Sequence, residues 1–320
     1  MKIDKFVLAL IAAVLVAWLF PYPVRGLSGI VLGHISTVAV SLIFFFYGLK
    51  LSTEKIRLGL RNWKLHILVQ TSTFLLFPLI VLVLYPFIKN EQQEILWLGI
   101  FFLAAVPSTV SSSVVMVSIG RGNIPAAIFN ASISGILGII LTPLWMGLFL
   151  QHTQPGFDFT EIYLRLILGI ILPVIIGLIM RRKWYSFALR HSRQLSIYDK
   201  SVILLIVYKS FATSFNDAVF KTVELLELAG MAVIVIALFF MIYLIVYIIS
   251  TILKFNREDR ITALFCSSQK SLVHGTVFSN VLFSGFYAAG LILVPLMLFH
   301  SLQIFMISII AARYGRKFKE

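Results

Sequence analysis

Long apolar runs separated by short polar segments dominate the chain. A helix that crosses the hydrocarbon layer of a bilayer, roughly 30 Å thick, needs about 20 predominantly apolar residues. The sequence offers ten such runs, at 5–21, 29–49, 63–86, 95–119, 124–150, 162–181, 200–219, 229–253, 259–283 and 287–312. The intervals between them are too short for a soluble domain. The pattern therefore predicts an all-α polytopic membrane protein with ten transmembrane helices.

Composition supports this fold class. The chain has 320 residues, of which 60% are hydrophobic and 12% charged, with a mean hydropathy of +0.99. Soluble domains average about 45–50% apolar and about 25% charged residues. The formal net charge of +14 does not predict nucleic-acid binding, because basic residues gather in the cytoplasmic loops of membrane proteins. The single cysteine, Cys266, excludes an internal disulfide, and no Cys/His spacing typical of a zinc site occurs.

Lys and Arg are distributed unevenly between the two sets of loops. With the N-terminus in the cytoplasm, 21 of the 27 basic residues lie in cytoplasmic segments, and three lie within predicted spans. The outer loops carry only Arg25, Lys89 and Lys221. Because cytoplasmic loops of membrane proteins are enriched in Lys and Arg, this bias predicts a plasma (inner) membrane protein with both termini in the cytoplasm.

The two halves of the chain show a local similarity. The fifth span contains LTPLWMGLF (141–149) and the tenth contains LVPLMLF (293–299), and each follows a span with polar residues in its middle. Paired interruptions in corresponding spans are typical of transporters built from inverted repeats. We therefore expect a single transporter unit composed of a first five-helix repeat (1–150) and a second one (151–320).

The fourth span is interrupted by VPSTVSSSV (106–114). Pro107 has no amide hydrogen and clashes with the preceding turn, so the helix is expected to break there. Hydroxyl groups that could bind the freed backbone belong to Ser108, Thr109, Ser111, Ser112 and Ser113. Single serines often serve only to let membrane helices pack closely. So many hydroxyl groups beside a proline favour a polar cavity instead.

The ninth span contains FCSSQKSLVHG (265–275). Its polar patch is longer than the 3.6 residues of a helical turn, so it covers every helix face and needs an aqueous or protein-lined environment. The patch after Cys266 consists of Ser267, Ser268, Gln269, Lys270 and Ser271. A lysine can snorkel to the membrane surface, but Lys270 lies in the middle of its span. An intramembrane charge is costly unless it is paired or hydrated, which indicates a functional role.

Further polar residues lie in other predicted spans. They are Gln70 in the third span, Asn130, Ser132 and Ser134 in the fifth, Lys209 and Asp217 in the seventh, and His274 in the ninth. Asn130 and Ser134 are one turn apart and share a helix face. Lys209 and Asp217 stay open between a structural and a functional role. None of the thirteen acidic residues lies in the middle of a span, which argues against an ion site built on a carboxylate.

Several of these segments resemble the bile acid:sodium symporter family, and most closely its branch typified by sodium/bile acid cotransporter 7. The resemblance covers nearly the whole chain. It rests on FFFYGLKLS (44–52), WKLHILVQTSTFLLFP (63–78), PSTVSSSVVM (107–116), AAIFNASISGILGIILTP (126–143) and FCSSQKSLVHG (265–275). It implies a panel domain of helices 1, 2, 6 and 7 and a core domain of helices 3–5 and 8–10, with helices 4 and 9 broken and crossing.

The resemblance also implies an ion and substrate site at the crossing, and sodium as the one cofactor. The sodium ligands carried over are Gln70, Ser112, Ser113, Asn130, Ser134 and Gln269. Two positions depart from the sodium-coupled members, because Phe265 stands in place of a glutamate and Lys270 in place of an uncharged polar residue. The expected crossing site therefore comprises Gln70, Pro107, Thr109, Ser111, Ser112, Ser113, Asn130, Ser134, Ser268, Gln269, Lys270 and Ser271, with His274, Lys209 and Asp217 as auxiliary residues.

These observations predict secondary transport of an organic anion by alternating access. We expect the Lys270 ammonium to occupy the space of a sodium ion and its protonation to replace sodium in coupling, because burial disfavours a charged amine. Two other functions stay open: a non-transporting membrane regulator of calcium or ion homeostasis, and a cation/proton antiporter, although such pumps usually carry protons on Asp or Glu. No nucleophile–base pair or metal cluster indicates an enzyme. The expected partners are a small organic anion and the lipid bilayer.

Overall fold

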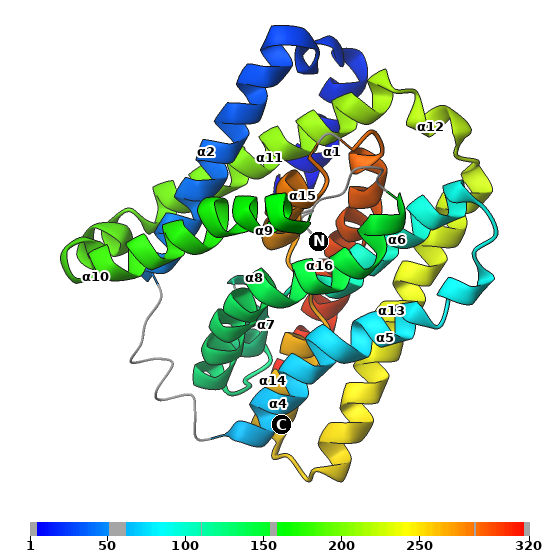
Figure 1. The fold of residues 1–320 in the computed structure, drawn as a ribbon. Helices are drawn as coiled ribbons and strands as arrows, with labels where there is room; N and C mark the ends of the chain where they lie inside the picture. Colours follow the sequence, from blue (N-terminus) through cyan, green and yellow to red (C-terminus); the bar gives the residue numbers. More distant parts are fainter. Residues whose placement is uncertain (1–4, 51–61, 110, 154–158, 285, 317–320) are drawn as a thin grey trace. The chain divides into compact units, whose positions relative to one another are not determined.

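A computed structural model of the chain describes residues 5–50, 62–109, 111–153, 159–284 and 286–316 (Figure 1). Helices form in each of the ten predicted ranges, and these described residues contain no strand. Six helical stretches are long and apolar enough to cross a membrane: Gly26–Lys50, Trp63–Phe87, Ile124–Leu150, Leu164–Arg190, Leu225–Ile252 and Ala289–Arg316. The all-helical fold is confirmed, whereas the ten-span inverted repeat stays a prediction.

The chain divides into two compact units. Unit 1 consists of residues 1–51, 150–224 and 276–293, and unit 2 of residues 52–149, 225–275 and 294–320. The first, second, sixth and seventh predicted spans fall in unit 1, and the ninth and tenth are divided between the units. The assignment of these units to a panel and a core domain stays a prediction.

Unit 1 is built on long helices that pack through small residues. Its elements are α1 (Lys5–Leu19), α2 (Gly26–Lys50), α9 (Phe159–Leu166), the π-helical turn η4 (Ile167–Ile171), α10 (Leu172–Arg190), α11 (Ser192–Asn216) and α12 (Val219–Thr222). A Cβ atom on Gly48 of α2 or Gly177 of α10 would collide with the backbone of the other helix. Glycines thus permit the close approach that is typical of membrane helices. Large apolar side chains such as Leu27 (83% exposed) face outward, as lipid-facing positions do.

Unit 2 carries the interrupted helices. Its elements are α4 (Trp63–Thr71), the π-helical turn η2 (Ser72–Leu76), α5 (Phe77–Leu82), α6 (Glu91–Ala105), α7 (Ser111–Ile119), α8 (Ile124–Thr153), α13 (Leu225–Ile252), α14 (Arg257–Ser267) and most of α16 (Ala289–Arg316). Short 3-10 turns occur at Tyr22–Val24 in unit 1 and at Tyr85–Phe87 in unit 2. α15 (Leu272–Leu282) begins in unit 2 and continues in unit 1.

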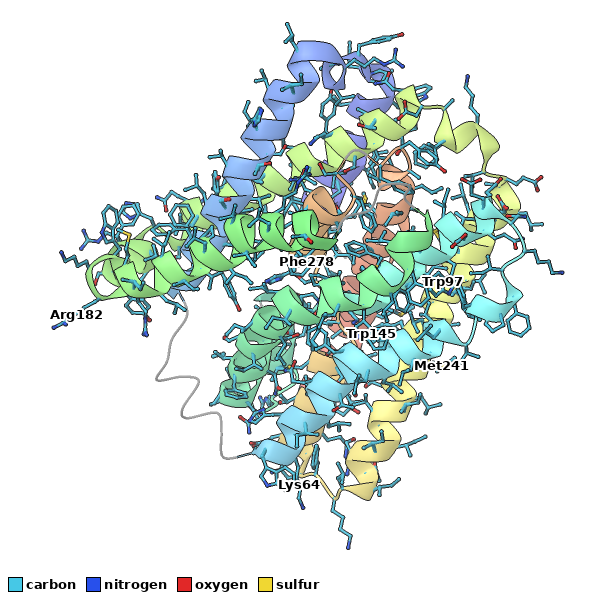
Figure 2. All side chains as sticks on the ribbon, in the orientation of Figure 1. Lys64, Trp97, Trp145, Arg182, Met241 and Phe278 are labelled. Carbon is cyan, nitrogen blue, oxygen red and sulfur yellow. The ribbon has the colours of Figure 1, made fainter. Side chains whose placement is uncertain are left out.

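Aromatic side chains fix α6 and α8 against the α4–α5 segment. Trp97 stacks on Phe101 with 4.8 Å between the ring centroids, and Phe149 packs edge-on against both rings. The indole N–H of Trp97 donates to the Val81 carbonyl (3.1 Å), and that of Trp145 donates to the Phe74 carbonyl (2.7 Å; Figure 2). Buried indole groups need such partners, so these contacts hold the segment that precedes the fourth-span break.

The start of α14 is fixed by a carboxylate. The Asp259 carboxylate accepts hydrogen bonds from the side-chain amides of Asn62 (2.6 Å) and Asn123 (2.8 Å). The Asn256 side chain caps the helix by accepting from the Asp259 amide at 2.8 Å, as N-cap residues do. This cluster joins the beginnings of α4, α8 and α14, and therefore anchors the ninth-span segment at one end.

Candidate functional site: two helix breaks joined by a buried lysine

Both predicted interruptions are helix breaks, and they lie against each other in unit 2. α6 ends at Ala105 and α7 begins at Ser111, while α14 ends at Ser267 and α15 begins at Leu272. The break at Pro107 is thus confirmed, and the CSSQKS segment breaks its helix without any Pro or Gly. The Ser271 amide donates to the Pro107 carbonyl at 2.9 Å, and the Ser108 hydroxyl donates to the Cys266 carbonyl at 2.7 Å. Each break therefore binds backbone of the other.

Side chains from neighbouring helices bind most of the remaining freed backbone. The Thr142 hydroxyl donates to the Ala105 carbonyl at 2.9 Å, and the Ser134 hydroxyl accepts from the Ser108 amide at 2.9 Å. Gln303 of α16 binds the Lys270 peptide twice, accepting from its N–H (2.7 Å) and donating to its C=O (2.8 Å). Unpaired backbone groups are costly in a bilayer interior, so these partners explain how the breaks are tolerated.

The Lys270 side chain occupies the centre of the breaks. Its Nζ donates to three backbone carbonyls, those of Thr73 (2.8 Å), Ala104 (2.6 Å) and Val106 (2.9 Å). The nitrogen lies 4.2 Å from the centroid of the Phe77 ring, and the residue is 0% exposed. An ammonium group has three N–H donors and no acceptor. Three carbonyl partners therefore match the protonated amine, and the arrangement excludes snorkelling.

The charge of this ammonium is balanced by dipoles. Ala104 and Val106 lie at the C-terminal end of α6, which carries the negative end of the helix dipole. Thr73 lies in the π-helical turn η2, and such turns often occur at functional sites. The Phe77 ring adds a cation–π contact. In the part of the chain that the structure describes, no carboxylate bonds to Lys270, so carbonyl dipoles and a ring face replace a counter-ion.

Sodium binding by the expected residues stays a prediction. Their polar groups already bond within the protein: Ser112 to Gln269 (2.8 Å), Ser113 to the Thr109 carbonyl (2.6 Å), Gln70 to Asn130 (3.2 Å), and Ser134 to the Ser108 amide (2.9 Å). No cluster of three His, Cys, Asp or Glu side chains that could hold a metal occurs among the described residues. The Lys270 nitrogen lies instead among three carbonyl oxygens, the kind of ligand that a small hard cation takes.

Three buried polar atoms beside the breaks keep spare bonding capacity. The Gln70 Oε1, Ser267 Oγ and Gln269 Nε2 atoms have no hydrogen-bond partner within the described residues. Buried polar atoms of this kind are few in native proteins, and each requires an explanation. Two of them, Gln70 Oε1 and Gln269 Nε2, belong to predicted site residues and can each take one further hydrogen-bond partner.

The predicted residues fall into three groups. Those brought together at the breaks are Gln70, Pro107, Thr109, Ser112, Ser113, Asn130, Ser134, Ser268, Gln269, Lys270 and Ser271. Ser111 begins α7, and its side chain lies outside the described part of the structure. His274 bonds to the adjacent Ser271 (2.9 Å), whereas Lys209 and Asp217 belong to unit 1 and have no place in this cluster.

Sequence reasoning missed the partners of Lys270. Thr73 contributes only its backbone, and Phe77 resembles any other apolar span residue, so neither carried a signal. Thr142 lies in the fifth predicted span next to Pro143, and its bond to the Ala105 carbonyl was not predicted. Gln303 was the detectable one, because a glutamine in the middle of the tenth predicted span needs buried partners.

The chain is similar to one protein family and to several known proteins. Residues 4–316 match the model of the SBF-like CPA transporter family. Putative symporter YfeH of Escherichia coli is 32% identical over 98% of this chain and 94% of its own length. Uncharacterized protein PA2026 of Pseudomonas aeruginosa is 36% identical over 98% and 93% of the two chains. Sodium/bile acid cotransporter 7 of Danio rerio is 33% identical over 86% and 82%.

Proposed function

Because the chain belongs to the SBF-like CPA transporter family, whose members are membrane transporters, we propose that it is a secondary active transporter of an organic anion. It works by alternating access and without sodium. The observation that carries the sodium-free coupling is the Lys270 ammonium among the carbonyls of Thr73, Ala104 and Val106. This fixed cation already takes three carbonyl oxygens, the kind of ligand that a bound metal cation would use.

The helix breaks support an anionic substrate. α7 and α15 both begin at the breaks, at Ser111 and Leu272. Helix N-termini carry a partial positive charge and unsatisfied N–H groups, which favour an anionic ligand. The ammonium of Lys270 adds a positive charge to the same region. An anionic organic substrate also agrees with the name of the relative called sodium/bile acid cotransporter 7.

We assign proton coupling to Lys270. The other titratable groups around the breaks are Cys266, His274 and His300, of which His300 bonds to Gln303 at 3.1 Å. Among these groups, the Lys270 amine is bonded to the backbone at the end of α6, through the Ala104 and Val106 carbonyls, so its deprotonation would weaken that attachment directly. After the loss of one proton, the amine has two N–H donors for three carbonyl acceptors. The cluster is therefore expected to loosen when Lys270 is neutral and to close when it is charged.

The test uses purified protein in liposomes that hold a pH-sensitive dye and contain only potassium salts. Concentration jumps of a panel of carboxylates and sulfonates are applied, and dye response and charge movement are recorded together. We expect anion-dependent proton movement without sodium, and its loss in Lys270→Met. The matched control is Lys64→Met, which removes an exposed lysine of unit 2 (Figure 2). Anion flux that requires a sodium gradient would contradict the proposal.

A further inference from the structure

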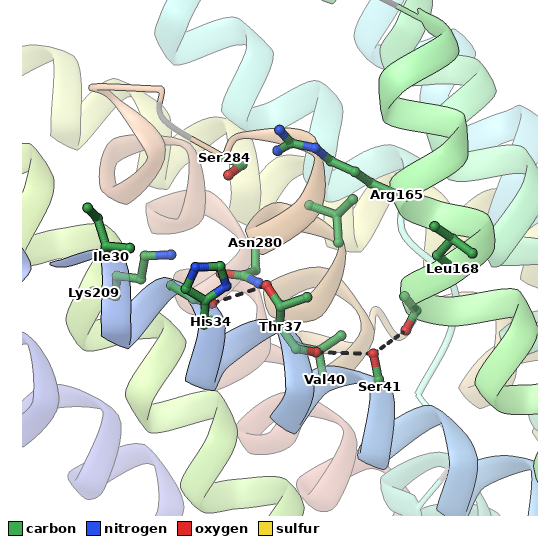
Figure 3. A pocket seen from close by; sticks show the side chains of 13 residues that line it. Ile30, His34, Thr37, Val40, Ser41, Arg165, Leu168, Lys209, Asn280 and Ser284 are labelled. Atoms are coloured by element: carbon green, nitrogen blue, oxygen red, sulfur yellow. Dashed lines mark hydrogen bonds between the residues drawn. The ribbon is translucent and has the colours of Figure 1, made fainter. Parts of the chain in front are cut away.

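Unit 1 contains a cavity that the helix breaks do not explain. It has a volume of 460 Å³, within the range of about 300–1,000 Å³ that is typical of small-molecule sites. Residues of α2, α9, η4, α11 and α15 line it, together with Ser284, which follows α15 (Figure 3). All the lining residues belong to unit 1.

The charge of this cavity is positive. Arg165, Lys209 and His34 line it, and none of the described lining residues is acidic. Lys209 is half-buried, and it makes no ion pair or hydrogen bond within the described part of the chain. A lysine within a membrane span is costly without a partner. The cavity thus keeps a cation that a negatively charged ligand would pair.

The neutral polar groups of the cavity also favour an acceptor-rich ligand. Thr37 and Ser41 use their hydroxyl hydrogens on backbone carbonyls, those of Gly33 (3.1 Å) and Gly169 (3.2 Å). Asn280 and Ser284 make no hydrogen bond to the residues that the structure describes. Figure 3 shows the Lys209 side chain extending toward His34 and Asn280, with Arg165 and Ser284 on another side of the cavity. The Lys209 ammonium and the Asn280 side-chain amide therefore offer N–H donors to a ligand.

Apolar side chains complete the wall. Ile30, Val40, Leu168 and Val281 line the same cavity. An inorganic anion alone would leave them without a contact, whereas an organic anion with an apolar portion fills both parts. Gly33 lies beside the amine: a Cβ atom added there would lie 3.8 Å from the Lys209 Nζ, an ordinary van der Waals distance.

We propose that this cavity is a binding site for an organic anion, with a carboxylate, sulfonate or phosphate group held by Lys209 and Arg165 and an apolar portion resting on Leu168 and Val281. Its use for a transported anion rests on the proposed function. The site is separate from the Lys270 cluster, which lies in unit 2. In the predicted topology most of the lining residues lie in the outer halves of their spans, with Val40, Ser41 and Lys209 near the middle.

The test measures equilibrium binding to the protein in nanodiscs of neutral lipid. The probes are benzoate, benzenesulfonate and phenyl phosphate, with benzamide and benzylamine as neutral and cationic compounds of similar shape. We expect the wild type to bind at least one anionic probe more tightly than both controls. Lys209→Met and Arg165→Met are each expected to weaken that binding about tenfold or more, as for loss of a charge-assisted hydrogen bond.

Matched variants separate this site from a general charge effect. Lys221→Met and Arg182→Met remove the same charge from exposed positions of unit 1, of which Arg182 is labelled in Figure 2, and binding is expected to be unchanged. Gly33→Leu keeps every charge but fills the space beside Lys209, so it is expected to abolish binding. Lys209→Arg, which keeps the charge, is expected to retain it and shows that the fold survives substitution there.

Three results would overturn the proposal. One is anion binding that is equal in the wild type, Lys209→Met and Gly33→Leu. Another is the absence of preferential binding for every anionic probe. The third is displacement of the probes by anionic phospholipid in the nanodisc, which would assign the cavity to a lipid headgroup. Binding without flux in the liposome assay would instead contradict the transport function and leave this site standing.

Discussion

At the residue scale, we propose that the Lys270 side chain takes the place of a bound ion. A bound cation has to be recruited from solution, whereas a lysine is covalently present and pays only the ordering of its own side chain. Its three N–H groups meet the carbonyls of Thr73, Ala104 and Val106, and each freed carbonyl would otherwise be left in a low-dielectric interior. The lysine therefore stabilises the fourth-span break, and in the proposed function it also carries the charge used in coupling.

Gln303 gives a prediction at this scale. Its amide forms two hydrogen bonds to the Lys270 peptide, so Gln303→Leu leaves one buried N–H and one buried C=O without partners. Each such group costs about 1–3 kcal/mol, and we expect Gln303→Leu to lower the free energy of unfolding by about 2–4 kcal/mol. Thermal unfolding in detergent measures it. Gln303→Glu, which keeps the acceptor for the Lys270 N–H, is expected to lose less; equal losses in both variants would contradict the two-bond assignment.

At the element scale, the breaks are defined by what packs against them. Pro107 lies directly against α8, because a Cβ atom on Gly138 would come within 2.7 Å of the proline ring. α16 supplies Gln303, and α8 supplies Thr142 and Ser134. The geometry of the breaks is thus set in part by two other helices, α8 and α16.

Gly138 provides the corresponding prediction. Gly138→Ala is expected to destabilise the protein by about 1–3 kcal/mol, as overpacking of a tight core contact does. The matched control is Gly230→Ala in α13, where the added Cβ meets nothing within 4 Å; there we expect no loss, because alanine favours helix. In a double-mutant cycle, Pro107→Ala should relieve part of the Gly138→Ala penalty. Additive losses would show that the proline ring is not the contact concerned.

Elements were the part most readily predicted. Hydrophobic runs predicted helices in all ten ranges, and Pro107 and the CSSQKS patch predicted the breaks. The partners of the breaks could not be predicted, because Thr73, Ala104 and Val106 act through their backbone, which any residue possesses. The sodium ligands inferred from the resemblance stay a prediction; several of these side chains bond to one another, as Ser112 does to Gln269 and Gln70 to Asn130.

At the scale of the whole molecule, the orientation in the membrane is testable. The charge bias predicts that Lys221 faces the outside and Arg182 the cytoplasm, and both side chains are exposed. The only native cysteine, Cys266, is buried, so single cysteines can be introduced into a Cys266→Ala background. A membrane-impermeant maleimide applied to intact cells should label Lys221→Cys and not Arg182→Cys, and permeabilised cells should label both. The opposite pattern in intact cells would reverse the predicted topology.

The account as a whole depends on whether a lysine has taken the place of sodium. The most direct measurement is thermal stability of the purified protein in sodium and in potassium at equal ionic strength, for wild type and Lys270→Ala. A ligand that binds only the folded state raises stability with its concentration. We predict equal stability of the wild type in both salts. Lys270→Ala should be less stable and should regain stability in sodium, because three carbonyls then lack a cation. Sodium-specific stabilisation of the wild type, unchanged in Lys270→Ala, would contradict the central claim.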